Sequence, residues 1–440
     1  MRFVRLVAFG QTSIILVLYF KSIGITETLV GIFMSLTLFG DVFLSFVLTL
    51  YADRLGRRNV LTGGALMMTL SGIVFVLSNN FYVLLIAAII GVISPSGGEI
   101  GPFRAVEESC LAQLVSLESR ADVYAWSTVL GGLGGAIGSI SGGYLIRLLQ
   151  DQYSFSPVES YKGIYVFYSV CGALKLLFTV LLTKNVELHP DDKKAQDAVV
   201  AAKAVDNRAP NVGSAETDAL LQGSGQPAQN AAPVKSQGLL SRLMPHLSHE
   251  SKKIVFLLSC LFAVDALGSS MTNSSWTSYY ISRKFGISES FLGSIFFTTG
   301  LVSCVGSLLG SSISKRLGPL ITMVVTHLPS SILQMFVPYP NTVHGALLIM
   351  IIRASTCTMD VAPRQTFLSS VVLKSERTAV MGWVNVVKTL AQMIGPTFTG
   401  HLTGMDMQWL CFVIGGALKV LYDLGILSTF LNVKLDRDHN

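Results

Sequence analysis

Charged residues are scarce in this chain of 440 residues. Asp, Glu, Lys and Arg together make up 13% of it, whereas hydrophobic residues make up 51%. Soluble domains carry about 25% charged residues, so this composition excludes an ordinary soluble fold and indicates that the solvent is lipid. The formal net charge is +6. Much of that excess lies in short segments between apolar runs, which indicates membrane orientation and not binding to nucleic acid.

Motifs of several other protein classes are also missing. The sequence has no Walker A loop, which disfavours an ATP-driven pump. Its six cysteines lie within or at the ends of apolar segments without paired spacing, so we expect neither a disulfide framework nor a metal site. The loops are short and place no nucleophile beside a base. We therefore expect no catalytic residue, no cofactor and no enzyme activity.

Apolar runs long enough to cross a bilayer fill most of the sequence. They predict an all-α polytopic membrane protein with twelve transmembrane helices at residues 3–20, 29–51, 60–77, 81–103, 123–149, 164–182, 254–281, 291–313, 320–337, 346–368, 379–402 and 409–431. The intervening residues 184–253 are polar and rich in Ala, Asp, Lys, Gln and Pro.

These runs divide the chain into four parts. We predict an N-terminal six-helix bundle at 1–183, a disordered cytoplasmic linker at 184–253, a C-terminal six-helix bundle at 254–431 and a short cytoplasmic tail at 432–440. A simple tether is the favoured interpretation of the linker, and a regulatory segment is the alternative.

Basic residues in the short loops predict the orientation. An even number of spans places both termini on one side, and the loops of that side carry Arg54, Arg57, Arg58, Arg104, Arg120, Lys315, Arg316, Lys374 and Arg377. Fewer basic residues lie in the opposite loops, namely Lys21, Lys162, Arg283 and Lys284. Because short cytoplasmic loops are enriched in Lys and Arg, both termini are expected to be cytoplasmic.

The two halves repeat short motifs in the same order. Gly24-Ile-Thr-Glu27 recurs as Gly286-Ile-Ser-Glu289, 262 residues later. The same offset relates Gly56 to Gly318, and further matches follow at shrinking offsets: Glu99 with Asp360, Gly138 with Gly395, and Lys175 with Lys419. Two six-helix units repeated in one orientation are typical of secondary transporters, whose substrate path lies between the units.

The loop between the second and third predicted helices resembles the signature loop of the major facilitator superfamily. It reads Asp53-Arg54-Leu55-Gly56-Arg57-Arg58. The resemblance implies the twelve-helix fold of that family and transport by alternating access. It also implies that Asp53, Arg54, Gly56, Arg57 and Arg58 form a conformational gate through contacts between the halves. A topology signal alone is the alternative role of the loop.

This resemblance has two departures from the family pattern. Thr49 stands where the family has glycine, and Lys315 replaces the acid in the second half. Any charge relay is therefore expected to be asymmetric between the halves.

Small residues in the fifth and eleventh predicted helices form another pattern. Gly134, Gly138, Gly142 and Gly143 resemble the antiporter motif of the same family, although Ser139 stands where proline is expected. The eleventh helix has Gly395 and Gly400. Because small residues also let helices approach closely in lipid, we interpret all six glycines as helix-packing residues.

Acidic residues within the predicted spans are candidates for proton coupling. A charge at the centre of a bilayer costs about 2.5 to 3.5 kcal/mol, so each one is a functional candidate. The candidates are Asp41, Asp265, Glu99 and Asp360. Asp41 has no basic residue within a helical turn, so burial favours its neutral form and a role as proton carrier. The alternative for these acids is structural ion pairing, for example between Asp265 and Arg353.

Other polar residues in the spans are candidates for the substrate path. They are Gln11, Asn273, Arg353, Asn385, Lys388 and Gln392. Arg353 and Lys388 favour an anionic solute, but Asp41 and Asp265 offset them, so the substrate class stays open at this point. His327 is a further candidate for a proton carrier, but a lone histidine in a span is more often a hydrogen-bonded core residue, and we adopt that interpretation. Lys175 and Lys419 each need a polar partner or a snorkelling path to the interface, and the sequence identifies neither.

Together these patterns predict a secondary transporter that acts as a monomer in a lipid bilayer. It is expected to move a small-molecule substrate by alternating access, coupled to protons. One alternative is a passive facilitator of the same fold. Another is a membrane receptor or scaffold that does not transport.

Overall fold

The computed structural model describes residues 1–91, 93, 102–116, 119–183, 186, 249–371 and 377–431. The helices of the N-terminal half are α1 (Arg2–Ser22), α2 (Glu27–Leu55), α3 (Arg57–Leu77), α4 (Phe81–Gly91), α5 (Pro102–Leu114), α6 (Arg120–Tyr153) and α7 (Pro157–Val180). Those of the C-terminal half are α10 (His249–Met271), α11 (Ser274–Phe285), α12 (Glu289–Leu317), α13 (Pro319–Phe336), α14 (Val343–Thr356), α15 (Val361–Val371), α16 (Arg377–Gly404) and α17 (Trp409–Phe430).

These helices confirm the predicted all-α membrane fold. Ten spans among the described residues are long and apolar enough to cross a bilayer, and Phe81–Gly91 is a shorter apolar helix. Each of the twelve predicted spans coincides with all or most of at least one helix, and two of them coincide with two helices, namely α10 with α11 and α14 with α15. The span predicted at 81–103 holds α4, whereas α5 begins at its end and continues to Leu114, in a segment that was predicted to be a loop. The linker and the C-terminal tail fall largely outside the described residues, although α10 begins at His249, inside the predicted linker range.

Turns at repeat-related positions use glycine in the same way. Gly24 and Gly286 have φ values of 84° and 61°, and Gly56 and Gly318 have values of 87° and 80°. Side chains disfavour this left-handed region, so glycine is the residue that forms these turns with little strain. The sequence repeat thus extends to backbone conformation.

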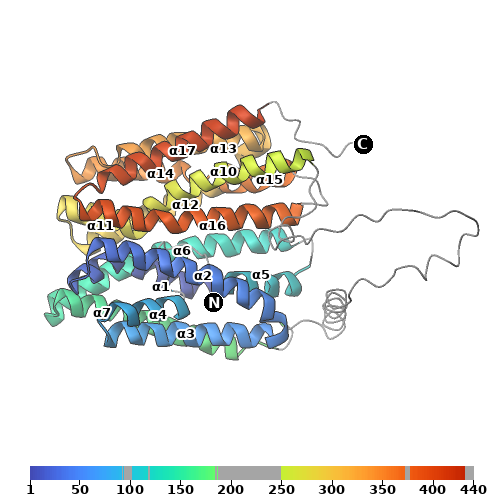
Figure 1. Cartoon of the computed structure of the whole chain (residues 1–440). Helices are drawn as coiled ribbons and strands as arrows, with labels where there is room; N and C mark the ends of the chain where they lie inside the picture. The colour runs from blue at the N-terminus through green and yellow to red at the C-terminus, as the bar shows by residue number, and fades with distance from the viewer. Residues whose placement is uncertain are drawn as a thin grey trace, which may run out of the picture.

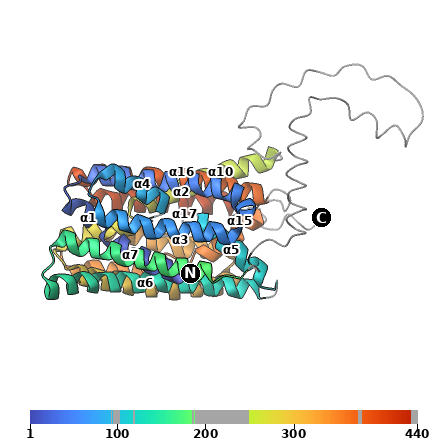
Figure 2. The same cartoon turned by 90° about the horizontal axis from the view of Figure 1, so that it is seen from below.

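The packing of the helices follows the same repeat. Within the halves α1 packs along α6 as α10 packs along α16, and α3 packs along α7 as α13 packs along α17. The halves meet through α2 with α16, α6 with α12, and α1 with α11. Figure 1 shows the N-terminal half, blue to green, beside the C-terminal half, yellow to red, and Figure 2 shows the same helices from below.

Aromatic side chains fill the core of the N-terminal half. Tyr19, Phe20, Phe75 and Tyr165 contact one another and are almost fully buried. Many large apolar residues, such as Leu77 at 78% exposure, instead lie on the outer surface of the bundle. This exposed apolar surface fits a chain whose helices face lipid.

Candidate functional site

A cavity of about 480 Å³ lies between the two halves. Its walls come from α1 and α6 in the N-terminal half and from α11, α12 and α14 in the C-terminal half. On α1 the lining residues run from Arg2 to Ser13, the half of the helix nearer the N-terminus. The cavity therefore extends from mid-helix toward the end of the bundle where α1 begins.

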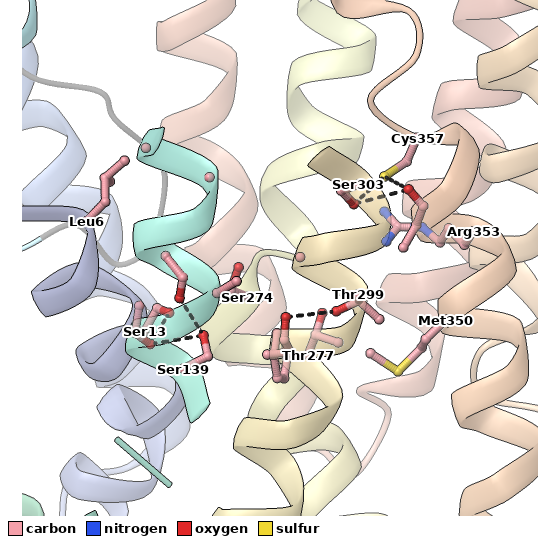
Figure 3. A pocket seen from close by; sticks show the side chains of 18 of the residues that line it. Leu6, Ser13, Ser139, Ser274, Thr277, Thr299, Ser303, Met350, Arg353 and Cys357 are labelled. Carbon is pink, nitrogen blue, oxygen red and sulfur yellow. Dashed lines mark hydrogen bonds between the residues drawn. The ribbon is translucent and has the colours of Figure 1, made fainter. Parts of the chain in front are cut away.

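Hydroxyl groups and arginine supply the polar part of the walls of this cavity, beside glycines and apolar side chains. Figure 3 shows Ser13 and Ser139 on the wall formed by α1 and α6, facing Thr299, Ser303 and Arg353 on the wall formed by α12 and α14. Each hydroxyl can both donate and accept a hydrogen bond. The surface therefore suits a polar solute.

Arg353 is the charged group deepest in the cavity. Its Nη2 donates to Oε1 of Gln334 on α13 at 2.9 Å, and its Nε is buried without a partner. Within the described part of the chain no carboxylate lies at ion-pairing distance from Arg353. Sequence reasoning identified Arg353 as a substrate-path candidate, and the structure places it on the cavity wall.

Asp265 forms ion pairs, but its partners are not Arg353. Its carboxylate accepts from Nη1 of Arg364 on α15 at 2.8 Å and from Nζ of Lys419 on α17 at 3.0 Å. Arg364 also pairs with Asp360, four residues earlier. Two of the predicted proton-coupling acids are thus joined by one arginine in the C-terminal half.

The N-terminal half has a smaller network of the same kind. Glu107 on α5 accepts two hydrogen bonds from Arg5 on α1, at 3.1 and 2.9 Å, and lies 3.5 Å from Nζ of Lys175 on α7. The repeated lysines Lys175 and Lys419 therefore each pair with an acid from another helix. This pairing satisfies two buried charges that sequence reasoning left without partners.

Asp41 differs from the other acids. It is fully buried on α2, and both of its carboxylate oxygens lack a hydrogen-bond partner among the described residues. It does not line the described cavity. Burial of a carboxyl group without partners is less unfavourable in free energy for the neutral acid than for the anion.

The remaining substrate-path candidates are dispersed. Gln11 donates to Ser141 on α6 at 3.0 Å, and Asn273 caps α11 by accepting from the backbone N–H of Trp276 at 3.0 Å. Neither one lines the cavity, although the neighbours of Asn273, Thr272 and Ser274, do. On α16, Asn385 is exposed, and Lys388 and Gln392 are half-buried outside the cavity wall.

Only part of the predicted gate loop can be placed. Asp53 and Arg54 form the last turn of α2, and nothing of their side chains is described. Arg58 donates to the carbonyl oxygen of Val180 at 2.6 Å, a contact within the N-terminal half. Glu99, the fourth proton-coupling candidate, lies outside the described residues, so its role stays a prediction.

The halves touch closely at the end of the bundle opposite the cavity opening. A Cβ atom on Gly143 of α6 would collide with the backbone of Glu289 on α12, and one on Gly400 of α16 would collide with the backbone of Glu27 on α2. These are repeat-related contacts, because Glu27 and Glu289 are 262 residues apart. The other predicted packing glycines, Gly134, Gly138, Gly142 and Gly395, approach α1 or α10 within their own halves.

Two tyrosines bridge the halves at this same end. Tyr161 on α7 donates to Oε1 of Glu289 at 2.7 Å, and Tyr279 on α11 donates to Oε1 of Glu27 at 2.9 Å. We call these four residues the Tyr–Glu clasp. Each bond joins a tyrosine of one half to a glutamate of the other, so the clasp holds the halves together on the side opposite the cavity opening.

Comparison with known proteins decides the family. The model for the Major Facilitator Superfamily matches residues 2–252 and 258–437 of the chain. The chain belongs to the major facilitator superfamily. This membership identifies the protein as an integral, multi-pass membrane transporter and not an enzyme.

The chain is also similar to individual members and solved structures. It is 35% identical over 435 residues to an uncharacterized membrane protein of Saccharomyces cerevisiae, covering 98% of this chain and 92% of the relative.

Among solved structures, a D-xylose–proton symporter superposes with a TM-score of 0.70 at 13% identity, covering 97% of this chain and 95% of that one. A bacterial homologue of the human lysosomal transporter Spinster, in an inward-facing and occupied conformation, gives 0.68 at 14% identity, covering 97% and 94%. At these identities the structural likeness extends to the fold alone.

Sequence reasoning missed several members of these sites. Asp423 on α17 was not singled out. His327 on α13 is buried and hydrogen-bonded as expected, and its unforeseen partner is the Asp423 carboxylate, 2.8 Å from Nδ1. Glu27 and Glu289 were visible as part of the repeat, but their tyrosine partners were not. The repeat of an acid at both positions was the signal that could have pointed to the clasp.

Proposed function

We propose that this protein is a secondary transporter that moves a small anionic solute by alternating access between its two halves, coupled to protons. The observation that carries this proposal is Arg353, whose guanidinium lines the cavity between the halves and has no carboxylate partner in the described part of the chain.

Electrostatics supports an anionic substrate. A charged side chain within the bilayer is unfavourable by about 2.5 to 3.5 kcal/mol unless a counter-charge or water compensates it. Asp265 and Asp360 are engaged by Arg364 and do not reach Arg353. A bound anion would supply the missing charge, and a carboxylate or phosphate matches the planar fork of the guanidinium.

The size and lining of the cavity support a small polar molecule. A volume of about 480 Å³ lies at the lower end of the range found for ligand pockets. Ser303 and Thr299 lie on the same wall as Arg353, so they can bind polar groups that surround the anionic one. This polar path at mid-membrane depth also favours transport over a receptor or scaffold role.

Asp41 supports proton coupling. Because its buried carboxylate has no partner among the described residues, the neutral acid is the favoured form in this conformation. Hydration of Asp41 in the opposite access state would favour the anion and release the proton. The positive charge of the loops on the termini side supports cytoplasmic termini, with the cavity open to the cytoplasm in this conformation.

Transport by purified protein in proteoliposomes tests the proposal. The screen uses radiolabelled monocarboxylates, dicarboxylates and inorganic phosphate, with neutral sugars for comparison, each with and without a pH gradient. We expect gradient-dependent accumulation of an anion by the wild type and its loss in Arg353→Gln. The matched control is Arg147→Gln, which removes an exposed arginine that pairs with Asp151.

The outcomes separate the alternatives. Equal uptake with and without the pH gradient would indicate a passive facilitator. Uptake of neutral sugars that Arg353→Gln leaves unchanged would contradict the anionic substrate.

A further inference from the structure

A second polar centre lies inside the C-terminal half, apart from the cavity. His327 on α13 is 3% exposed, and Asp423 and Lys419 on α17 are 0% and 7% exposed. Nδ1 of His327 lies 2.8 and 2.9 Å from the two carboxylate oxygens of Asp423. Its Nε2 lies 3.4 Å from Nζ of Lys419 and 3.7 Å from Oδ1 of Asp265. The imidazole is therefore held between acids and an ammonium group with little access to water.

The carboxylate of Asp423 has His327 as its only possible cationic partner at ion-pairing distance among the described residues. The other two carboxylates, Asp265 and Asp360, pair with Arg364 and Lys419, whereas Asp423 contacts His327 and Ser331. Burial of an uncompensated charge is strongly unfavourable, so one further positive charge stabilises the centre. An imidazolium at His327 provides it directly beside Asp423.

The helices packed against α13 carry the other charged and titratable groups near His327. Besides the groups above, α17 contributes the ring of Tyr422, 5.9 Å from the imidazole, and α14 contributes Arg353. Lys315 and Arg316 lie in the last turn of α12. His327 lies about two turns into the next helix, α13, which begins at Pro319. Lys388 on α16 interacts electrostatically with Asp265 but forms no hydrogen bond among the described residues.

The two protonation states of the imidazole require different neighbours. In the neutral ring with its proton on Nδ1, that nitrogen donates to Asp423 and Nε2 accepts from Lys419. In the imidazolium both nitrogens donate, so Nε2 can no longer accept from Lys419 and instead faces the Asp265 carboxylate. Binding of one proton to His327 thus exchanges the partner of its Nε2, from Lys419 on α17 to Asp265 on α10.

One face of α13 connects this centre to the cavity. His327, Ser331 and Gln334 lie at positions i, i+4 and i+7, which share a helix face. Ser331 donates to Oδ2 of Asp423 at 3.2 Å, and Oε1 of Gln334 accepts from Arg353 on the cavity wall at 2.9 Å. The helix that carries the histidine therefore also holds the cavity arginine.

We propose that His327, together with Asp423, Lys419 and Asp265, forms a proton-binding site that is coupled to the cavity through the polar face of α13. Proton binding shifts α13 relative to α10 and α17, and Gln334 transmits this shift to Arg353. The proposal deepens the proposed function and rests on it for the link to transport. It places a proton site in the C-terminal half, in addition to Asp41 in the N-terminal half.

Labelling of the cavity without any substrate tests this coupling. Cys357 lines the cavity beside Arg353, so its alkylation by a small maleimide reports the state of the cavity in a variant whose other cysteines are replaced. The rate is measured from about pH 5.5 to about pH 7.5, the window in which imidazoles titrate. At each pH we take the ratio of the alkylation rate in His327→Gln to the rate in the parent. This ratio cancels the titration of the Cys357 thiol, which is common to both.

We expect this ratio to change by at least about fivefold across the pH window, the lower end of measured coupling between sites. The control His344→Gln, which removes an exposed histidine on α14, should give a constant ratio near one. A constant ratio for His327→Gln would overturn the proposal.

Asp423→Asn provides an independent variant if His327→Gln does not fold. Removal of the carboxylate that Nδ1 contacts takes away the counter-charge of the imidazolium, so the pH-dependent change in labelling rate should move to lower pH. A change at the parental pH would overturn the proposal. Labelling needs no transport, so the two proposals can fail separately. If the wild type takes up no anion in proteoliposomes but its Cys357 labelling still depends on pH through His327, only the proposed function is contradicted.

Discussion

Under the proposed alternating access, the Tyr–Glu clasp predicts which contacts break between the two access states. The variants Tyr161→Phe and Tyr279→Phe each remove one hydroxyl and leave the aromatic ring in place. In the present conformation these hydroxyls donate to Glu289 and Glu27 at 2.7 and 2.9 Å across the two halves. Both bonds must break when the halves separate at this end. We therefore expect the variants to favour the state that is open at the clasp.

The size of the effect follows from the acceptors. A hydrogen bond to a charged group contributes about 1.5 to 3 kcal/mol, and we use the lower value because these bonds are only partly buried. Since about 1.4 kcal/mol corresponds to a factor of ten, each variant should raise the ratio of clasp-open to clasp-closed protein about tenfold. The double variant should raise it about 100-fold if the two bonds act independently.

Spin labels measure this ratio directly. Asn80 and Asn341 are exposed in turns near the clasp end of the two halves, so the distance between labels at Asn80→Cys and Asn341→Cys reports separation. The controls are Tyr165→Phe on α7 and Tyr280→Phe on α11. The hydroxyl of Tyr165 has no partner among the described residues, and no hydrogen bond is described for Tyr280. Equal distance distributions in the double variant and the controls would refute the role of the clasp.

Three further predictions follow from other parts of the molecule. Asp41→Asn should abolish uphill transport in proteoliposomes while sparing exchange of solute for solute, and an unchanged pH dependence would contradict this. Gly400→Leu should shift the equilibrium away from the clasp-closed state by about 1 to 3 kcal/mol in the spin-label assay, because its side chain collides with Glu27, whereas Gly63→Leu points into open space and should not. Shortening residues 190–235 to a flexible tether should leave folding and transport intact, and an inactive product would reveal a docked element.

The fold could be predicted because apolar length and repetition are properties of the sequence alone. A bilayer requires about 20 apolar residues for each helix, so the runs gave the spans directly. The breaks within spans were harder to predict. Asn273 interrupts one span by capping α11, but its side chain resembles any polar residue in a helix until its bond to Trp276 is seen.

For the sites, the sequence could predict only how deep each residue lies in the membrane. Helical rise placed Arg353 and Asp265 near the same level of the membrane, and a direct ion pair between them was a reasonable hypothesis. The structure instead pairs Asp265 with Lys419 and Arg364, because the packing of α10 against α17 and the approach of α15 decide which side chains meet. The sequence of a single helix contains no information on these lateral neighbours.

Proton movement driven by an anion gradient is the most direct test of proton-coupled anion transport through the cavity. Proteoliposomes at equal internal and external pH receive an inward gradient of the anion identified in the uptake screen, and an enclosed pH-sensitive dye reports proton flux. Coupling between two ligands is reciprocal, so the anion gradient should drive a proton flux in the wild type and none in Arg353→Gln. Anion uptake by the wild type without any change in internal pH would contradict proton coupling.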